Sequence, residues 1–134
     1  MIVIDANVMV MALSSPTAQG DTARAAMLAD DDWIAPAHMP VEVLRTLRKA
    51  VLGDRLTADA SDSAFRALAA MQVVYVGTDA ALLHAVWVMR HNVSMYDAAY
   101  LAVAALHDAP LVTFDARLAK AAEQVNPGIR VTPL

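Results

Sequence analysis

The sequence contains no cysteine, which excludes disulfide bonds, thiolate metal ligands and cysteine nucleophiles. It also lacks any uncharged apolar run of the roughly 18 residues that a membrane-spanning helix needs. The apolar start, residues 1–4, has no basic region before it and is followed directly by Asp5, so it does not resemble a secretory signal. We therefore expect a cytoplasmic protein without membrane contact.

Positive charge is also scarce. The 134 residues carry 10 Lys and Arg against 14 Asp and Glu, which gives a formal net charge of -4. A net-acidic chain does not attract nucleic acid through its overall charge, so any RNA binding must depend on local basic residues and bound metal. The hydrophobic content of 58% excludes disorder. We predict that residues 1–134 fold as one domain.

Short apolar segments alternate with longer alanine-rich segments along the chain. This alternation is typical of an α/β fold with a mainly parallel sheet. We predict strands at residues 1–4, 33–35, 73–76, 111–113 and 129–131. We predict helices at roughly 18–30, 38–53, 57–70, 79–91, 95–107 and 115–124, and the 29 alanines of the chain favour helix formation.

Two of the predicted strands end in an acid. Asp5 follows Ile2-Val-Ile and precedes Ala-Asn7, and Asp115 follows Leu111-Val-Thr-Phe. Parallel strands of one sheet end at the same edge, where α/β folds bind ligands, so we expect both carboxylates there. The alternative for each acid is that it caps the helix after it by accepting backbone N–H bonds.

Two further acids lie in the first turns of predicted helices. Asp97 begins a helix of small and apolar residues that must be buried over most of its surface. Ser94 is the better candidate for the cap of that helix, which leaves Asp97 free for another role. Glu42 lies between two valines, close to the apolar face of its helix. The alternative for Glu42 is a first-turn acid that is favoured by the helix dipole and paired with Arg45.

Four carboxylates brought together need a counterion. Two unit charges ~4 Å apart repel by ~4 kcal/mol at an effective dielectric constant of ~20, so a bare cluster would take up protons or spread apart. Oxygen ligands without cysteine or clustered histidine favour Mg²⁺ or Mn²⁺ over Zn²⁺. A water bound to such an ion is an activated nucleophile. The sequence is therefore consistent with phosphodiester hydrolysis that needs no Ser, Cys or His.

The order and setting of these motifs resemble the PIN-domain ribonucleases, in particular the toxins of VapBC toxin–antitoxin pairs. The resemblance spans almost the whole chain and rests on the strand ending Asp5-Ala-Asn7, Glu42 after Pro40, the block Ser94-Met-Tyr-Asp97-Ala-Ala-Tyr-Leu-Ala, and Leu-Val-Thr113-Phe-Asp115. It implies a PIN-like three-layer α/β/α sandwich around a five-stranded sheet of order 3-2-1-4-5, with the acids at one edge.

The resemblance also implies roles for these residues and partners for the protein. The implied catalytic metal ligands, for Mg²⁺ or Mn²⁺, are Asp5, Glu42, Asp97 and Asp115, with Asn7 and Thr113 as auxiliary polar groups. The implied activity is that of a type II toxin, an endoribonuclease that cleaves single-stranded or loop regions of structured RNA such as transfer or ribosomal RNA. Relatives of this kind commonly form homodimers, and a cognate antitoxin blocks the site with a segment that carries a basic residue.

Several other polar side chains allow two interpretations. Arg45 and Lys49 follow Glu42 and could form a basic rim that contacts RNA phosphates. The alternative is a solvated helix face, since Lys and Arg are mostly exposed in any case. The 4 histidines, His38 among them, show no metal-ligand spacing, so we expect ordinary unpaired side chains.

Two competing functions stay open at this point. The first is a phosphatase with Asp5 as the nucleophile, although that chemistry usually wants a second acid at the position of Asn7 and a lysine at a strand end. The second is a PIN-like module that binds RNA or a protein without catalysis. Divalent-cation binding that depends on Asp97 would distinguish the enzyme from the module.

Overall fold

Five parallel strands form one central sheet in the computed structural model, which describes residues 1–134. The strands are β1 (Ile2–Ile4), β2 (Trp33–Pro36), β3 (Val74–Val76), β4 (Leu111–Thr113) and β5 (Val131–Pro133), and their order in the sheet is β3-β2-β1-β4-β5. Every neighbouring pair is parallel. The predicted α/β class and the strand order implied by the family resemblance are confirmed.

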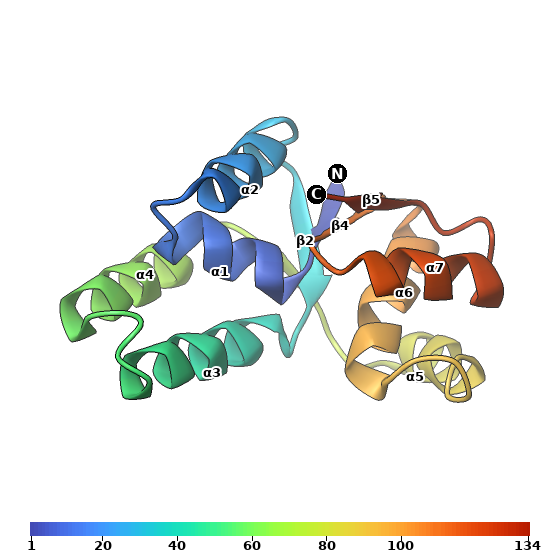
Figure 1. The fold of residues 1–134 in the computed structure, drawn as a ribbon. Coiled ribbons are helices and arrows are strands. Elements are labelled where there is room, and N and C mark those ends of the chain that lie inside the picture. Colours follow the sequence, from blue (N-terminus) through green and yellow to red (C-terminus); the bar gives the residue numbers. More distant parts are fainter.

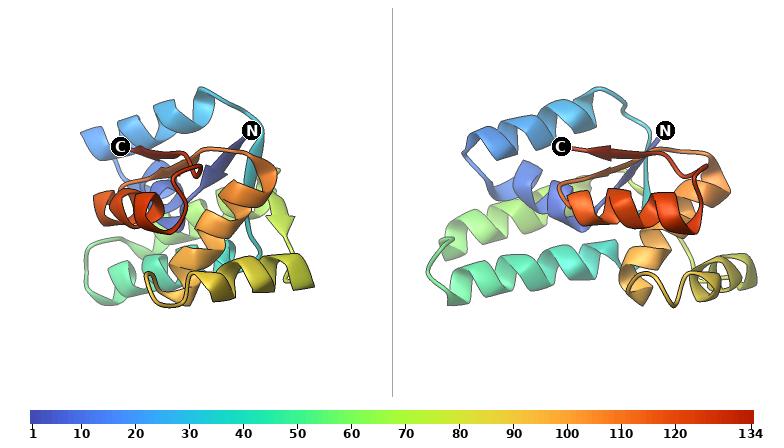
Figure 2. Two further views of the ribbon diagram at one scale, coloured as in Figure 1. Left: turned by 90° about the vertical axis from the view of Figure 1, so that its right-hand side faces the viewer. Right: turned by 45° about the vertical axis from the view of Figure 1, so that its right-hand side comes forward.

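Seven helices cover the two faces of the sheet. They are α1 (Ala6–Ser14), α2 (Ala18–Leu28), α3 (Met39–Leu52), α4 (Ala58–Ala70), α5 (Ala80–Val88), α6 (Met95–His107) and α7 (Ala116–Val125). Figure 1 shows α1 to α4 on one side of the sheet and α5 to α7 on the other, and Figure 2 shows α3 and α4 side by side. Right-handed crossovers explain the division, because β1 to β3 extend the sheet in one direction and β4 to β5 in the other. The expected three-layer sandwich is confirmed.

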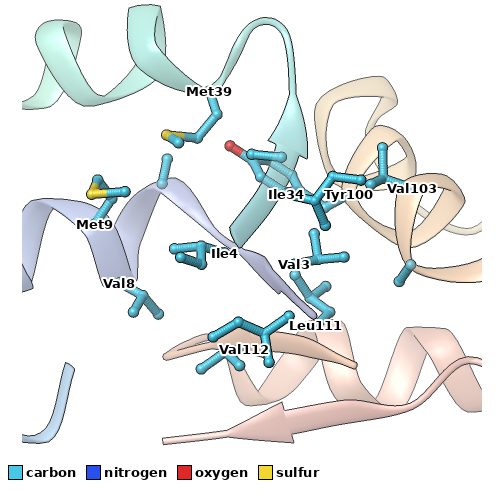
Figure 3. Close-up of a cluster of buried hydrophobic side chains, with 14 of the residues drawn as sticks. Val3, Ile4, Val8, Met9, Ile34, Met39, Tyr100, Val103, Leu111 and Val112 are labelled. Atoms are coloured by element: carbon cyan, nitrogen blue, oxygen red, sulfur yellow. The ribbon is translucent and has the colours of Figure 1, made fainter. Parts of the chain in front are cut away.

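The core is centred on β1 and α6. All three residues of β1 are buried, and α6 is buried without interruption from Ala98 to Ala104. Figure 3 shows Val3 of β1 in one cluster with Leu111 of β4 and Tyr100 of α6. The small side chains of α6 let its backbone approach the sheet closely, which fixes the position of its first turn. None of the seven helices combines the length and the apolar character that crossing a bilayer requires.

Two elements differ from the prediction. The helix α1 is missing from the predicted helices because its apolar residues form a nearly continuous run, which periodicity does not separate from a strand. The last strand lies at Val131–Pro133, two residues later than the predicted 129–131. The N–H of Ile129 bonds the carbonyl of Asn126 in a turn, so this buried apolar residue packs on the core from a turn and not from the strand.

Candidate active site

The predicted site residues come from four different elements that meet at the carboxyl edge of the sheet. β1 and β4 are parallel neighbours with Ile4 opposite Val112, so the residues that follow these two strands lie together. Asp5 follows β1, and Asp115 follows β4. β2 leads into α3, which carries Glu42, and α6 brings Asp97 in its first turn.

Asp5 is held by two neutral donors. Its side chain is buried, and its Oδ2 accepts hydrogen bonds from the Thr113 hydroxyl at 2.6 Å and from the Asn7 amide at 2.9 Å. Asp5 occupies the N-cap position of α1 but makes no capping bond with its side chain, so the capping alternative does not describe it. Asn7 also accepts a hydrogen bond from the Phe114 N–H at 3.1 Å, which ties the end of β4 to α1.

The electrostatic surroundings of Asp5 and Asp97 oppose ionisation. Burial raises the pKa of Asp5 above its ordinary value, and the charges of Asp97 and Glu42 raise it further. Burial likewise raises the pKa of Asp97, with further contributions from the charges of Asp115 and Glu42. As predicted, Ser94 caps α6, accepting from the Asp97 N–H at 3.2 Å. The carboxylates are thus close enough to repel one another, and neither Asp5 nor Asp97 forms an ion pair with a basic side chain.

Glu42 has partners that the sequence analysis did not predict. Its Oε2 accepts a hydrogen bond from the buried Tyr100 hydroxyl at 2.5 Å and lies 3.3 Å from Nε2 of His38. The His38 nitrogen is too poorly aligned for a hydrogen bond, and its ring meets the Tyr100 ring edge-on. The ion pair with Arg45, which was the alternative for Glu42, does not form. The sequence analysis expected His38 to lack a metal-ligand partner and did not foresee its contact with Glu42. One helical turn separates His38 from Glu42, which is the spacing that could have indicated the contact.

These partners change the charge state of Glu42. Burial acts to raise its pKa, but His38 and the Tyr100 hydroxyl outweigh burial and hold the pKa below its ordinary value. Arg45 lies near enough to lower it slightly more. Burial, and after it the hydrogen bond to Glu42, raise the pKa of Tyr100 far above its ordinary value, so this hydroxyl remains a donor. The signal for Tyr100 in the sequence is its place three residues after Asp97 on a buried helix.

Asp115 is the one acid of the four for which the capping alternative describes the structure. Its Oδ1 accepts from the Arg117 N–H at 2.9 Å at the start of α7. The Arg117 guanidinium also binds both carboxylate oxygens, at 3.0 Å and 2.9 Å. This hydrogen-bonded ion pair lowers the pKa of Asp115.

The donor set fits a hard divalent cation. All four acids offer oxygen ligands, and the buried carboxylate of Asp5 and the half-buried carboxylate of Asp97 are the groups that gain most from added positive charge. As the side chains stand, no three Asp, Glu or His residues enclose a common metal position. Glu42 is turned to Tyr100 and Asp115 to Arg117. Asp115 would have to give up Arg117 to join a ligand set, whereas Glu42 keeps its Oε1 free, because Tyr100 and His38 both contact its Oε2.

An open groove of about 870 Å³ lies beside Asp5 and Glu42, between α1 and α3. We call it the acidic groove; its polar lining consists of Asp5, Asn7, His38, Glu42, Arg45, Thr46 and Tyr96. Of the two predicted RNA contacts, Arg45 lines the acidic groove, and Lys49 lines the adjoining hollow farther along α3. A polymer with a phosphate backbone could therefore reach the acids from this side.

Comparison with known proteins agrees with this architecture. The sequence matches the PIN domain family over residues 2–124. Ribonuclease VapC1 of Mycobacterium tuberculosis is 36% identical over 119 residues, which cover 89% of this chain and 89% of that protein.

Two solved structures share the fold. The first is VapC20 of Mycobacterium tuberculosis, a sarcin–ricin-loop-cleaving toxin, with a TM-score of 0.67 and 19% identity over 90% of this chain and 95% of that one. The second is VapBC2 from Rickettsia felis bound to a promoter DNA fragment, with a TM-score of 0.69 and 13% identity over 99% of this chain and 98% of that one. Because the family match spans nearly the whole sequence and a curated ribonuclease is this similar, the chain belongs to the PIN-domain family.

Proposed function

We propose that this chain is an endoribonuclease that hydrolyses RNA phosphodiester bonds with Mg²⁺ or Mn²⁺, and that it is the toxin of a type II toxin–antitoxin pair. The observation that carries the proposal is the buried carboxylate of Asp5, which has neutral donors and two other carboxylates around it and no ion pair. Such a group opposes folding unless a cation joins it, because burial and like charges both disfavour its ionised form. The ribonuclease relative VapC1 supports the same activity here.

Each side chain of the site has a definite task in this proposal. Asp5 and Asp97 would hold the cation, with Glu42 and Asp115 as further ligands. When bound, the cation supplies Lewis-acid polarisation of the phosphate and makes a nucleophile of water. The Thr113 hydroxyl and the Asn7 amide fix the position of the Asp5 oxygen, and the Tyr100 hydroxyl fixes that of Glu42. Hydrolysis then adds water across one P–O ester bond without a covalent enzyme intermediate.

The nucleophilic-aspartate alternative has less support. Asn7 stands where that chemistry needs a second acid, and its amide donates to the carboxylate of Asp5 itself. The acidic groove has Arg45 and His38 in its lining but no lysine to stabilise a transferred phosphoryl group. The non-catalytic module differs from the enzyme only in activity, so the experiment below separates the two.

The proposal includes partners for the toxin. We propose a cytoplasmic homodimer, supported by the apolar helix α5, which leaves Leu83, Trp87 and Val88 exposed at 55%, 63% and 60%. We also propose a cognate antitoxin that places a basic side chain at the acidic edge, supported by the similarity to VapBC2. Light scattering of the purified chain tests the homodimer, and copurification after coexpression with a candidate antitoxin tests the second partner.

The activity is tested with purified chain and structured RNA in Mg²⁺, Mn²⁺ or EDTA. We expect cleavage that requires the divalent cation and is lost in Asp5→Asn and Asp97→Asn, with unchanged circular dichroism. Asp62→Asn is the matched control, because this acid is exposed on α4, away from the site. Cation-independent cleavage, or full cleavage by Asp97→Asn after control for contaminating nucleases, would refute the proposal. If Asp97→Asn binds divalent cations with the same affinity as the parent, the non-catalytic module is favoured.

A further inference from the structure

A second hollow continues the acidic groove along the same pair of helices. This basic groove has a volume of about 470 Å³ and lies between α1 and the second half of α3. Its polar lining consists of Ser14, Ser15, Thr17, Arg45, Thr46, Lys49 and Arg55. Figure 1 shows α1 and α3 next to each other on one face of the sheet, where the two helices pack together.

The two grooves adjoin, and we call them together the channel. Both are lined by Val10 and Met11 of α1 and by Arg45 and Thr46 of α3. Arg45 lies at the junction, and its charge reaches Glu42 at the acidic end. Along the α3 axis, Lys49 lies about 10 Å beyond Glu42, at a rise of ~1.5 Å per residue. The channel therefore runs from the acids past Arg45 to a region without any acid in its lining.

The basic side chains of this channel are not neutralised within the chain. Arg45, Lys49 and Arg55 form no ion pair, whereas Arg24, Arg117 and Arg130 each pair with an aspartate. Arg48, Arg66, Arg90 and Lys120 form no ion pair either, but only Arg45, Lys49 and Arg55 line these two grooves. The floor below them is apolar, with Val10, Met11 and Leu56 half-buried.

On the side of the acids that faces α6 and α7, the hollow is smaller and has no unpaired basic side chain in its lining. A smaller hollow of about 210 Å³ there is lined by Asp97, Asp115 and Arg117, with Val93 and Leu118. Its one basic residue, Arg117, is already bound to both oxygens of Asp115. The lining of this hollow therefore offers a ligand no basic side chain that is free of an acid.

We propose that this channel holds a single RNA strand on one side of the scissile phosphate only, with Arg45, Lys49 and Arg55 binding successive backbone phosphates. The inference rests on the proposed ribonuclease function and specifies how its substrate is held. A basic groove with an apolar floor suits a single strand, whose phosphates face the cations while its bases contact the floor. The consequence is asymmetric recognition, in which nucleotides on one flank of the cleavage site contribute to binding and those on the other do not.

The test measures binding of short fluorescent single-stranded oligoribonucleotides to the full chain in EDTA over a range of KCl concentrations. Each phosphate contact to a single strand contributes ~0.7 to the slope of log K against log [salt]. We expect Arg45→Gln, Lys49→Gln and Arg55→Gln each to reduce the slope by about 0.7, and the triple variant by about 2. Arg48→Gln is the matched control, since Arg48 is an exposed, unpaired residue of α3 that does not line the channel, and its slope should equal that of the parent.

The second part of the test shortens the oligoribonucleotide from either end. We expect truncation of one flank to weaken binding to the parent chain but not to the triple variant, and truncation of the other flank to change neither. Equal losses from both ends, or an equal change of slope in Arg48→Gln, would overturn the inference. If the Gln variants of the three basic residues bind RNA like the parent but no longer copurify with an antitoxin, the channel binds a protein segment and the inference is overturned. A parent that neither binds nor cleaves RNA would refute the ribonuclease function itself, whereas cation-dependent cleavage with unchanged slopes would refute only the channel.

Discussion

The hydroxyl of Tyr100 makes a contribution to stability that can be measured by the substitution Tyr100→Phe. The ring is 2% exposed, and the hydroxyl donates to Glu42 over 2.5 Å. A hydrogen bond to a charged group contributes ~1.5–3 kcal/mol. The side chain of Glu42 is 32% exposed and can recover water, so we expect the lower value. With an unfolding entropy of ~2.1 cal/mol/K per residue over 134 residues, a loss of ~1.5 kcal/mol lowers the melting temperature by about 5 °C.

The size of this loss depends on pH. Although burial acts to raise the pKa of Glu42, His38 and Tyr100 hold it below its ordinary value. A carboxyl whose pKa is lowered by folding stabilises the protein above its unfolded-state pKa, and this stabilisation disappears as the pH falls through the folded-state pKa. The difference between Tyr100→Phe and the parent should therefore be complete at neutral pH and shrink below about pH 4.

Thermal unfolding followed by circular dichroism across this pH range is the assay, and Tyr96→Phe is the matched control. Tyr96 lies on the same helix and also meets His38 edge-on, but it is 63% exposed and donates no hydrogen bond within the chain. We expect its melting temperature to match that of the parent. If Tyr100→Phe unfolds at the parent's temperature at neutral pH, or if its deficit persists in acid, the hydroxyl does not stabilise ionised Glu42.

Three further predictions test the neighbouring features. Burial raises the pKa of Asp5, so its ionised form opposes folding above that pKa. Asp5→Asn should therefore raise the melting temperature in EDTA at neutral pH, and added Mg²⁺ should not raise it further. A lower melting temperature of this variant in EDTA would contradict the reasoning. Arg117→Gln should raise the pKa of Asp115 toward its ordinary value, which NMR titration would show. The same variant should bind Mn²⁺ more tightly in calorimetry. Weaker binding would mean that Arg117 assists cation binding. Gly20→Ala should destabilise the fold by about 1–3 kcal/mol despite alanine's helix propensity, because the new Cβ would lie 2.1 Å from the Ser15 carbonyl oxygen. If urea unfolding shows a stabilised variant, the backbone shifts freely at this position.

The sequence predicted the fold because the buried strands are short apolar runs with clear ends. β1 and β4 are buried on both faces, and each is followed within two residues by an acid, so topology alone brings Asp5 and Asp115 to one edge. The last strand was placed two residues early because Ile129 is as buried as a strand residue although it lies in a turn. Burial is visible in a pattern of apolar residues, whereas the backbone hydrogen bonds that define a strand are not.

The partners of the acids were harder to predict than the acids themselves. Tyr100 reads as a core residue of α6, and its hydroxyl meets Glu42 only because α3 packs against the start of α6, 58 positions away in the chain. Arg45, at helical spacing from Glu42, looked like the natural partner but lines the channel instead. Local spacing predicts contacts within one helix, but a buried donor from another helix competes better, because water cannot replace it.

The kind of donor at each carboxylate separates the four acids. Asp5 and Glu42 are each held by a neutral hydroxyl, of Thr113 and Tyr100 respectively, and a neutral donor fixes an oxygen without cancelling its charge. Asp115 instead carries its own counterion in Arg117. The negative potential of the edge is therefore concentrated on Asp5, Glu42 and Asp97. A divalent cation would gain the most electrostatic free energy by neutralising these three groups. On this argument the fourth ligand position is where Arg117 and the cation compete, so cation affinity at the edge should respond to Arg117 more than to any other basic residue of the chain.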